Sequence, residues 1–285
     1  MAVKATVEAL LRDRRLDRTL TSSMPERLGE DAVAPLDLEA ADRGLLGGLP
    51  RGQVSEVVGP VSSGRTSLVW AALGAATRRG ECVALIDTFD RFDPPTAAAC
   101  GIDLTRLLWA RGQAISKTAG AVDPSWLPGV RPVGGAGTMV ERTIDRALKA
   151  LNLVVQSRVC TVVAIDLIDV PAVAMKRLPA STWFRIERAV EGSDIAVVLL
   201  ASAPVARSRG GRSISLGSVP DSRQGSTSRQ GSTSRQESVL PAVMWNGDHD
   251  RSRRFAGVTT PVEIGAAHWS RAERVVIETA AINAV

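Results

Sequence analysis

A glycine-rich stretch at residues 59–67 constrains the fold more than any other segment of this chain. It reads Gly-Pro-Val-Ser-Ser-Gly-Arg-Thr-Ser and matches G-x-x-x-x-G-K-[ST] at every defined position except the lysine. An apolar run precedes it at 54–58, and helical periodicity follows at 66–79. This order of strand, loop and helix is typical of a phosphate-binding loop, whereas the alternative is an ordinary glycine-rich turn. The residues expected to line a bound phosphate are Gly59, Ser62, Ser63, Gly64, Arg65, Thr66 and Ser67.

Arg65 stands where this motif carries its lysine. Arginine keeps the positive charge, but its planar fork is bulkier than an ammonium group and does not act as a compact point charge between two phosphates. We therefore expect weakened phosphate binding and poor catalysis. No cofactor is certain. ATP with Mg²⁺ is the candidate, and if a nucleotide binds, Thr66 and Asp166 are the expected metal ligands.

The rest of the chain alternates between strand and helix patterns. Alternation of this kind predicts a mostly parallel sheet with helices on both faces. Past residue 239 the pattern changes to strands that alternate in polarity, as in antiparallel pairs. The predicted fold class is α/β, with a mostly parallel central sheet flanked by helices and antiparallel strands at its C-terminal edge. Strands are expected at 54–58, 82–87, 107–110, 160–166, 195–201, 239–245, 254–260 and 274–279, and helices at 66–79, 95–101, 138–156 and 171–191.

Two segments stand apart from this core. Residues 2–20 carry apolar side chains at helical spacing and predict an amphipathic helix that packs either on its own core or on a neighbouring subunit or partner. The polar residues 21–45 have the composition of a linker. We divide the chain into an N-terminal helix and linker at 1–35 and a core at 36–285, interrupted by a basic loop at about 206–238.

The basic loop is rich in Arg, Ser, Gly and Gln and contains a tandem Gln-Gly-Ser-Thr-Ser-Arg repeat. It has too few apolar residues to offset the entropy of ordering, so we expect disorder. Flexible arginines bind single-stranded DNA by releasing counterions, while the alternative is a tolerated surface insertion. The candidate DNA-binding residues are Arg207, Arg209, Arg212, Arg223, Arg229 and Arg235.

Composition limits which functional classes and cellular locations are expected for this protein. The net charge of +5 and the pI near 9.7 permit nucleic-acid binding without requiring it. The three cysteines and two histidines are isolated, so neither a disulfide framework nor a zinc site is expected. No apolar run approaches the roughly 18–20 residues that span a bilayer, and no signal peptide is evident. We expect a cytoplasmic protein with no membrane partner.

Three stretches of the chain resemble the RecA family in order. Residues 47–64 are similar to that family's approach to its phosphate loop, 85–94 to its second strand and the loop after it, and 162–166 to its Walker B strand, which ends here in Asp166. The resemblance runs from about residue 36 to 203 and implies a RecA-like P-loop core. In the recombinases a glutamate two residues beyond the end of the second strand polarises the attacking water, and here Phe89 stands at that position. After the strand that ends at Ala201, the family carries a glutamine that senses the γ-phosphate. Here Ser202 and Ala203 occupy that region.

With these departures from the RecA pattern, the chain resembles the ImuA-type proteins, which are shortened RecA relatives of bacterial SOS mutagenesis cassettes. The resemblance implies a non-catalytic or weakly catalytic accessory protein in the DNA-damage response and translesion mutagenesis, associated with the bacterial nucleoid. The implied partners are a polymerase-like mutagenesis subunit and RecA, with single-stranded DNA and self-association as further candidates. One alternative is a divergent DNA-dependent ATPase or recombinase that uses Asp90 as a base. Another is a simple single-strand binder acting through the basic loop.

Overall fold

The structure is a computed structural model of the whole chain. It describes residues 32–112, 139–206, 208, 210–217, 242–246, 254–266 and 272–280. The amphipathic segment at 2–20 and most of the basic loop lie outside these residues. Their predicted structures therefore stay predictions.

One long sheet, in the order β11-β10-β8-β3-β7-β6-β4-β5, forms the centre of the molecule, and β9 pairs with β10 beyond this path. The six strands from β8 to β5 are parallel, and β9, β10 and β11 continue the sheet in antiparallel pairs. This arrangement confirms the predicted fold class. The strands are β3 (Gln53–Val58), β4 (Val83–Asp87), β5 (Leu107–Arg111), β6 (Val162–Asp166), β7 (Ala196–Ala201), β8 (Ser213–Leu216), β9 (Ala242–Asn246), β10 (Arg254–Gly265) and β11 (Glu273–Ala280).

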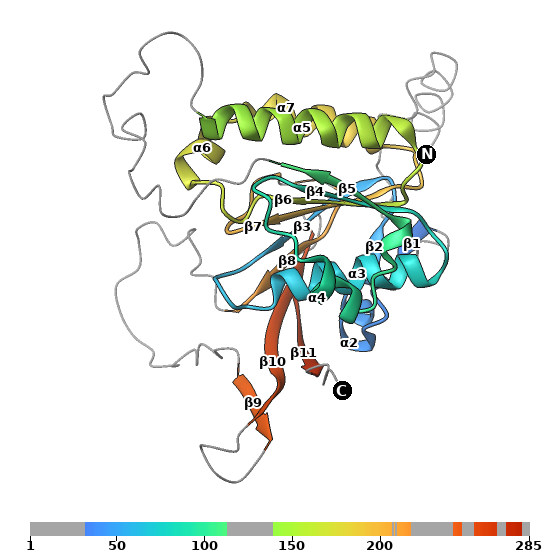
Figure 1. Cartoon of the computed structure of the whole chain (residues 1–285), viewed down its shortest axis with the longest axis vertical. Coiled ribbons are helices and arrows are strands. Elements are labelled where there is room, and N and C mark those ends of the chain that lie inside the picture. Colours follow the sequence, from blue (N-terminus) through green and yellow to red (C-terminus); the bar gives the residue numbers. More distant parts are fainter. Residues whose placement is uncertain are drawn as a thin grey trace, which may run out of the picture.

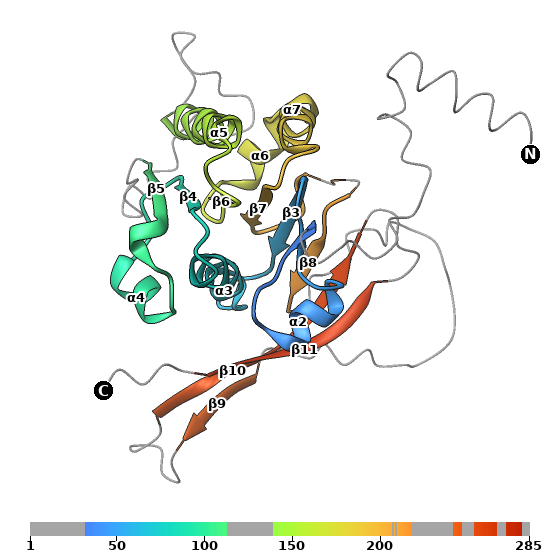
Figure 2. The same cartoon turned by 90° about the vertical axis from the view of Figure 1, so that its right-hand side faces the viewer.

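Helices cover the parallel part of the sheet on both faces (Figures 1 and 2). On one face lie α2 (Glu39–Gly44), α3 (Arg65–Arg78) and α4 (Pro94–Ala99), and on the other lie α5 (Met139–Ser157), α6 (Ala172–Arg177) and α7 (Ala180–Val190). Side chains alternate along each buried strand, so Leu85 of β4 packs toward α3 whereas Ile86 packs toward α5. The sheet thus separates two apolar cores.

The segment predicted as one helix at 171–191 forms two. Leu178 has an extended backbone, with φ −64° and ψ 126°, and Pro179 follows it. The ring of a proline disfavours helical geometry in the preceding residue and removes a helical N–H donor. The helical periodicity continues across this point, which is why the pattern alone suggested a single element.

Two segments predicted as irregular contain regular structure. The prediction of a linker at 21–45 is wrong for its second half. There β1 (Val33–Ala34) pairs with β2 (Leu49–Pro50), and α2 packs against β11. The prediction of a disordered loop at about 206–238 is wrong at β8, because this strand inserts between β3 and β10. In β8 only Ile214 and Leu216 are apolar, and both are buried. Two apolar residues in a short alternating strand are too few to alter the composition of a 33-residue polar segment.

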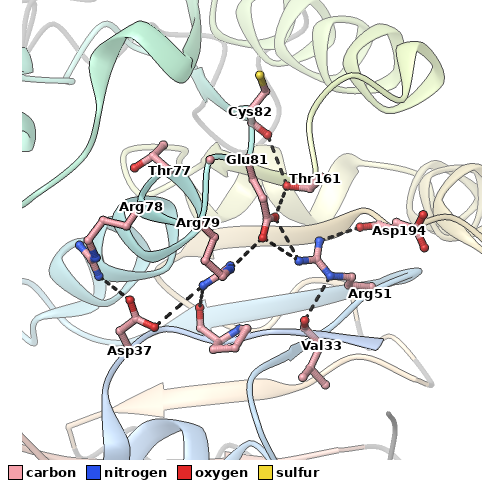
Figure 3. A network of polar contacts seen from close by, with 12 residues as sticks. Val33, Asp37, Arg51, Thr77, Arg78, Arg79, Glu81, Cys82, Thr161 and Asp194 are labelled. Carbon is pink, nitrogen blue, oxygen red and sulfur yellow. Dashed lines mark hydrogen bonds and ion pairs between the residues drawn. The ribbon is translucent and has the colours of Figure 1, made fainter. Parts of the chain in front are cut away.

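A half-buried carboxylate at the amino edge of the sheet ties the N-terminal segment to the core (Figure 3). Glu81, just before β4, accepts hydrogen bonds from Arg51 at 3.0 and 3.1 Å, from Arg79 at 2.8 Å and from the Thr161 hydroxyl. Arg51 also donates to the carbonyl of Val33 at 3.1 Å. Burial raises the pKa of Glu81, but these hydrogen bonds lower it more, so the net pKa lies below its ordinary value.

We predict that Glu81→Gln lowers the free energy of unfolding by about 1–3 kcal/mol near neutral pH, because it leaves the largely buried guanidinium of Arg51 without a charged acceptor. A depressed carboxyl pKa stabilises the fold above the ordinary value of 4.5 and loses this contribution as the pH falls below it. Urea unfolding of the wild type should therefore show an acid-side loss that the variant lacks. Glu39→Gln is the matched control, since the exposed Glu39–Arg43 pair should contribute less than about 0.5 kcal/mol. Equal effects of the two substitutions would contradict the role of Glu81.

Candidate phosphate-binding site

The parallel register brings the candidate residues to one edge of the sheet. β3 ends at Val58 opposite Ala201 of β7, and Asp87 and Asp166 lie opposite each other at the ends of β4 and β6. The loop at 59–64 leaves β3 at this edge and leads directly into α3. Ligand sites of open α/β sheets lie at the carboxyl ends of the strands, which is where this loop stands.

The loop backbone has the geometry of an anion cradle. Ser62 and Gly64 both have left-handed backbones, with φ of 62° and 88°, and Gly64 is the N-cap of α3. Alternation of this kind turns successive N–H groups inward, and the first turn of α3 adds N–H groups that have no acceptor within the helix. At Gly59 a Cβ atom would lie 2.6 Å from the Ser63 Oγ, so no larger residue fits. The Ser63 hydroxyl itself is buried and has no hydrogen-bond partner among the described residues.

Arg65 turns back into its own loop instead of facing solvent. Its guanidinium donates to the carbonyl of Gly59 and, at 3.4 Å, to the carbonyl of Ala201, and the residue is only 6% exposed. Burial lowers the pKa of Arg65, and the negative charges of Asp166 and Asp169 oppose this shift. The backbone of the loop therefore fits a phosphate group, but the side chain at the lysine position joins two strand ends.

Asp166 ends β6 at the same edge. Its carboxylate accepts a hydrogen bond of 2.9 Å from the N–H of Ile168. Burial raises the pKa of Asp166 to about 6, with smaller contributions from the nearby charges of Asp87 and Asp169. Thr66 is half-buried in the first turn of α3. Among the described residues no cluster of three His, Cys, Asp or Glu could hold a metal ion, so Mg²⁺ at Thr66 and Asp166 would depend on a nucleotide for its other ligands.

The residues near the expected water-activating position are engaged elsewhere. Phe89 is 5% exposed and packs in the core on the α5 side of the sheet, away from α3. Asp87 accepts hydrogen bonds from the N–H groups of Arg91 and Phe92 at 2.8 and 2.9 Å. Asp90 pairs with Arg111 through two bonds of 2.6 and 2.9 Å, which lower the pKa of this carboxyl. A carboxylate held in its ionised form by an arginine is a weak base, so the geometry does not favour Asp90 in that role.

The loops that follow β6 and β7 are also joined internally. Asp169 forms an ion pair with Arg91 at 3.0 Å, and the Ser202 hydroxyl donates to the carbonyl of Ile168 at 3.0 Å. Ser202 stands where the γ-phosphate sensor was expected, and Ala203 beside it is exposed. The sequence reasoning missed Asp169, Arg91 and Arg111. No motif marks them, and only their convergence at the sheet edge identifies them.

Of the six candidate DNA-binding arginines, only Arg212 lies among the described residues. It is 4% exposed, its backbone N–H donates to the Ser55 hydroxyl at 3.1 Å, and burial lowers its pKa. A guanidinium at this depth does not face a nucleic-acid backbone. The prediction that Arg212 binds DNA is therefore corrected. The strand β8 that it precedes explains its burial. The others, Arg207, Arg209, Arg223, Arg229 and Arg235, lie outside the described residues.

The fold and the loop define a mixed α/β protein with a phosphate-loop architecture, and residues 32–119 match the RecA N-terminal domain. This part of the chain is thus RecA-like. The chain is 40% identical to the RecA protein of Leifsonia xyli subsp. xyli over 111 residues, which are 37% of this chain and 30% of the relative. It is 43% identical to RecA of Acidothermus cellulolyticus over 88 residues, 29% of this chain and 26% of the relative. The chain therefore spans less than a third of the length of these curated relatives. In the described part of the chain, no helix is long and apolar enough to cross a membrane.

We predict that Asp166→Asn raises the free energy of unfolding near pH 7 by about 1–3 kcal/mol. The folded state keeps the Asp166 proton up to a pKa of about 6, whereas the unfolded state releases it near 3.8. The folded state binds more protons in this window, so this group makes stability fall as the pH rises through it. Urea unfolding at about pH 4.5 and about pH 7 should show this loss in the wild type and not in the variant. The exposed Asp194→Asn serves as control, and a parallel response of both variants would contradict the prediction.

Proposed function

We propose that this protein is a non-catalytic or weakly catalytic RecA-like accessory factor of the bacterial DNA-damage response, which acts through protein contacts. The RecA-like region supports a general role in DNA repair or recombination, because the matched relatives are RecA proteins. The narrower assignment to translesion mutagenesis rests on the resemblance to ImuA-type proteins. Its natural setting is then the cytoplasm, near the nucleoid.

The observation that carries the proposal is the orientation of Arg65. A catalytic P-loop uses a cation that reaches the β- and γ-phosphates and offsets the charge that develops during transfer. Here the guanidinium contacts the carbonyls of Gly59 and Ala201 and is buried. To reach a phosphate it would have to give up both hydrogen bonds. The loop is therefore stable without a nucleotide and badly prepared for catalysis.

The environment of Phe89 supports the same conclusion. A general base must lie within hydrogen-bond reach of the attacking water. Phe89 offers no such group and packs among apolar side chains such as Ile86 and Ile165. A glutamate at this depth would place a charge in an apolar core, which is strongly unfavourable. The position is thus adapted to packing.

The proposed partners follow from the resemblance and not from the described contacts. They are a polymerase-like mutagenesis subunit and RecA, with single-stranded DNA and a second copy of the chain as further candidates. The amphipathic segment at 2–20 is the natural candidate for a partner contact, because its apolar face needs a surface to cover it.

A divergent DNA-dependent ATPase is the second candidate function. The cradle geometry of Ser62 and Gly64 favours it, together with the position of Asp166 at the same edge of the sheet. This function would require Arg65 to leave its two carbonyls when nucleotide binds. It would also require a base other than Phe89. ATP binding and ATP hydrolysis therefore need to be measured separately.

We predict that the purified protein hydrolyses no ATP with or without single-stranded DNA. Arg65→Lys should strengthen ATP binding by about ten-fold or more, because the shorter cation frees the cradle, yet should leave turnover absent. Fluorescent-nucleotide titration and phosphate release measure the two steps. Thr66→Ala in the Arg65→Lys background is the control, and should lose the gained binding. Turnover that rises with DNA would overturn the proposal in favour of the divergent ATPase.

We also predict that deleting residues 2–20 abolishes capture of the polymerase-like partner, or self-association, and leaves the core folded. The melting temperature and the circular dichroism of the core should be unchanged, because in this proposal the apolar face of the segment packs on a partner and not on the core. Pull-down with the purified partner and light scattering provide the readouts. An unchanged pull-down and an unchanged mass would refute this role of the segment.

A further inference from the structure

The outer strand β11 leaves one edge of the sheet open. β11 pairs with β10 along one side, and none of the strands that the structure describes pairs with its other side. Figure 1 shows β10 and β11 extending away from helices α5, α6 and α7. An open strand edge presents N–H and C=O groups without partners, to which another strand can pair. The edge is therefore a place where a strand of another molecule can extend the sheet.

The two faces of β11 have different surroundings. Val275 packs against the core on the α2 side, and Ile277 is buried in that core. Because side chains alternate along a strand, Arg274, Val276 and Glu278 lie on the other face. All three are exposed, and Val276 keeps 54% of its surface exposed. This face thus carries an exposed valine between two opposite charges.

The two charged residues beside Val276 have no ion-pair partner in the part of the chain that the structure describes. Arg274 lies two residues before the valine, and Glu278 lies two residues after it. On β10 the register places Glu263 opposite Arg274 and Thr259 opposite Glu278, without an ion pair in either case. A cation and an anion at equal distances from a central residue become complementary to each other under a two-fold rotation.

We propose that two copies of this chain pair through β11 in antiparallel orientation, with the two-fold axis at Val276. In this register Val276 lies opposite Val276 of the second copy, and Arg274 lies opposite Glu278 of the second copy. The symmetry repeats this charge pair, so an ion pair flanks the valines on each side. On the α2 face, Val275 lies opposite Ile277 of the second copy. Cross-strand pairs of opposite charge and of β-branched side chains both stabilise antiparallel strands.

The charge pattern selects this register among those that the symmetry allows. A two-fold axis perpendicular to the sheet keeps each face on its own side, so opposite residues must point the same way. The axis therefore passes through a residue. With the axis at Val275, Arg274 would lie opposite Val276, and with the axis at Ile277, Glu278 would lie opposite Val276. Only the axis at Val276 brings the opposite charges together, and it places the α2 helices of both copies on the same face of the extended sheet.

The test is charge reversal in the full chain, followed by sedimentation equilibrium. The wild type should dimerise at about 10–100 µM, as befits an interface of small area. Arg274→Glu and Glu278→Arg should each weaken dimerisation by about ten-fold or more, because each sets like charges opposite one another twice. An equimolar mixture of these two variants should restore the dimer, and so should both substitutions in one chain. A wild type that stays monomeric at about 100 µM, or a mixture that stays monomeric, would overturn the proposal.

Two controls test the register. Glu273→Arg makes the same change of charge in the same strand, but residue 273 lies opposite Thr279 of the second copy, so dimerisation should change by less than about two-fold. Val276→Cys places two thiols side by side at the axis, and mild oxidation should yield a covalent dimer. Glu263→Cys on β10 should not, and the wild type controls for the three native cysteines. Loss of the dimer in Glu273→Arg, or crosslinking of Glu263→Cys alone, would contradict this register.

This interface is separate from residues 2–20 and from the loop at 59–67, so it does not rest on the proposed function. Deletion of residues 2–20 should leave the β11 dimer in place. A dimer that is lost with this deletion, but is kept by both charge-reversal variants, would assign self-association to the N-terminal segment and overturn the role of β11.

Discussion

The parallel pairing of β3 with β7 is the constraint on which the rest of the structure depends. It sets Val58 opposite Ala201 and thereby decides which loops meet at the carboxyl edge. β8 pairs with the other side of β3, so this strand has neighbours on both sides and both faces are buried. The loop at 59–64 thus starts from an interior strand of the sheet. Because its anchor is rigid, the loop can hold left-handed residues such as Ser62 in a fixed position.

Charged groups at this edge are largely neutralised by one another. Arg65 caps the carbonyls of two strand ends, Asp90 holds Arg111, and Asp169 holds Arg91. A catalytic site normally keeps such groups poised for a substrate and stores unfavourable electrostatics there. Here Asp166 alone retains a strongly raised pKa at this edge. The arrangement joins most of these charged groups to one another, and this supports the proposed non-catalytic role.

The two faces of the sheet carry different polar features at the same edge. On the α3 face the loop wraps around its own arginine, whereas on the α5 face the Thr88 hydroxyl is buried without a hydrogen-bond partner among the described residues. Among the described residues of the amino edge, Glu81 and the arginines around it satisfy one another and fasten the N-terminal segment (Figure 3). The polar groups around Glu81 at the amino edge therefore contribute to stability.

Most of the fold could be predicted from local patterns. Strands such as β6 and β7 are continuous apolar runs, and the glycine loop marks where β3 ends and α3 begins, so fold class and element order followed directly. Errors arose where a tertiary contact outweighed composition. The short strand β8 is ordered because Ile214 and Leu216 reach the core, and α2 is ordered because it packs on β11. The break at Pro179 was readable from the residue but was hidden by periodicity that continues past it.

The sequence by itself determined the class of fold, the place of the glycine-rich loop at 59–67 and the arginine at its lysine position, because spacing and residue type are local properties of the chain. Only the tertiary structure decided where the side chains at those positions point. It turned Arg65 inward onto Ala201, 136 residues further along the chain, and it buried Phe89 on the α5 face. It also packed α2 against β11. Such contacts join residues far apart in sequence, and the packing of the sheet and its helices creates them.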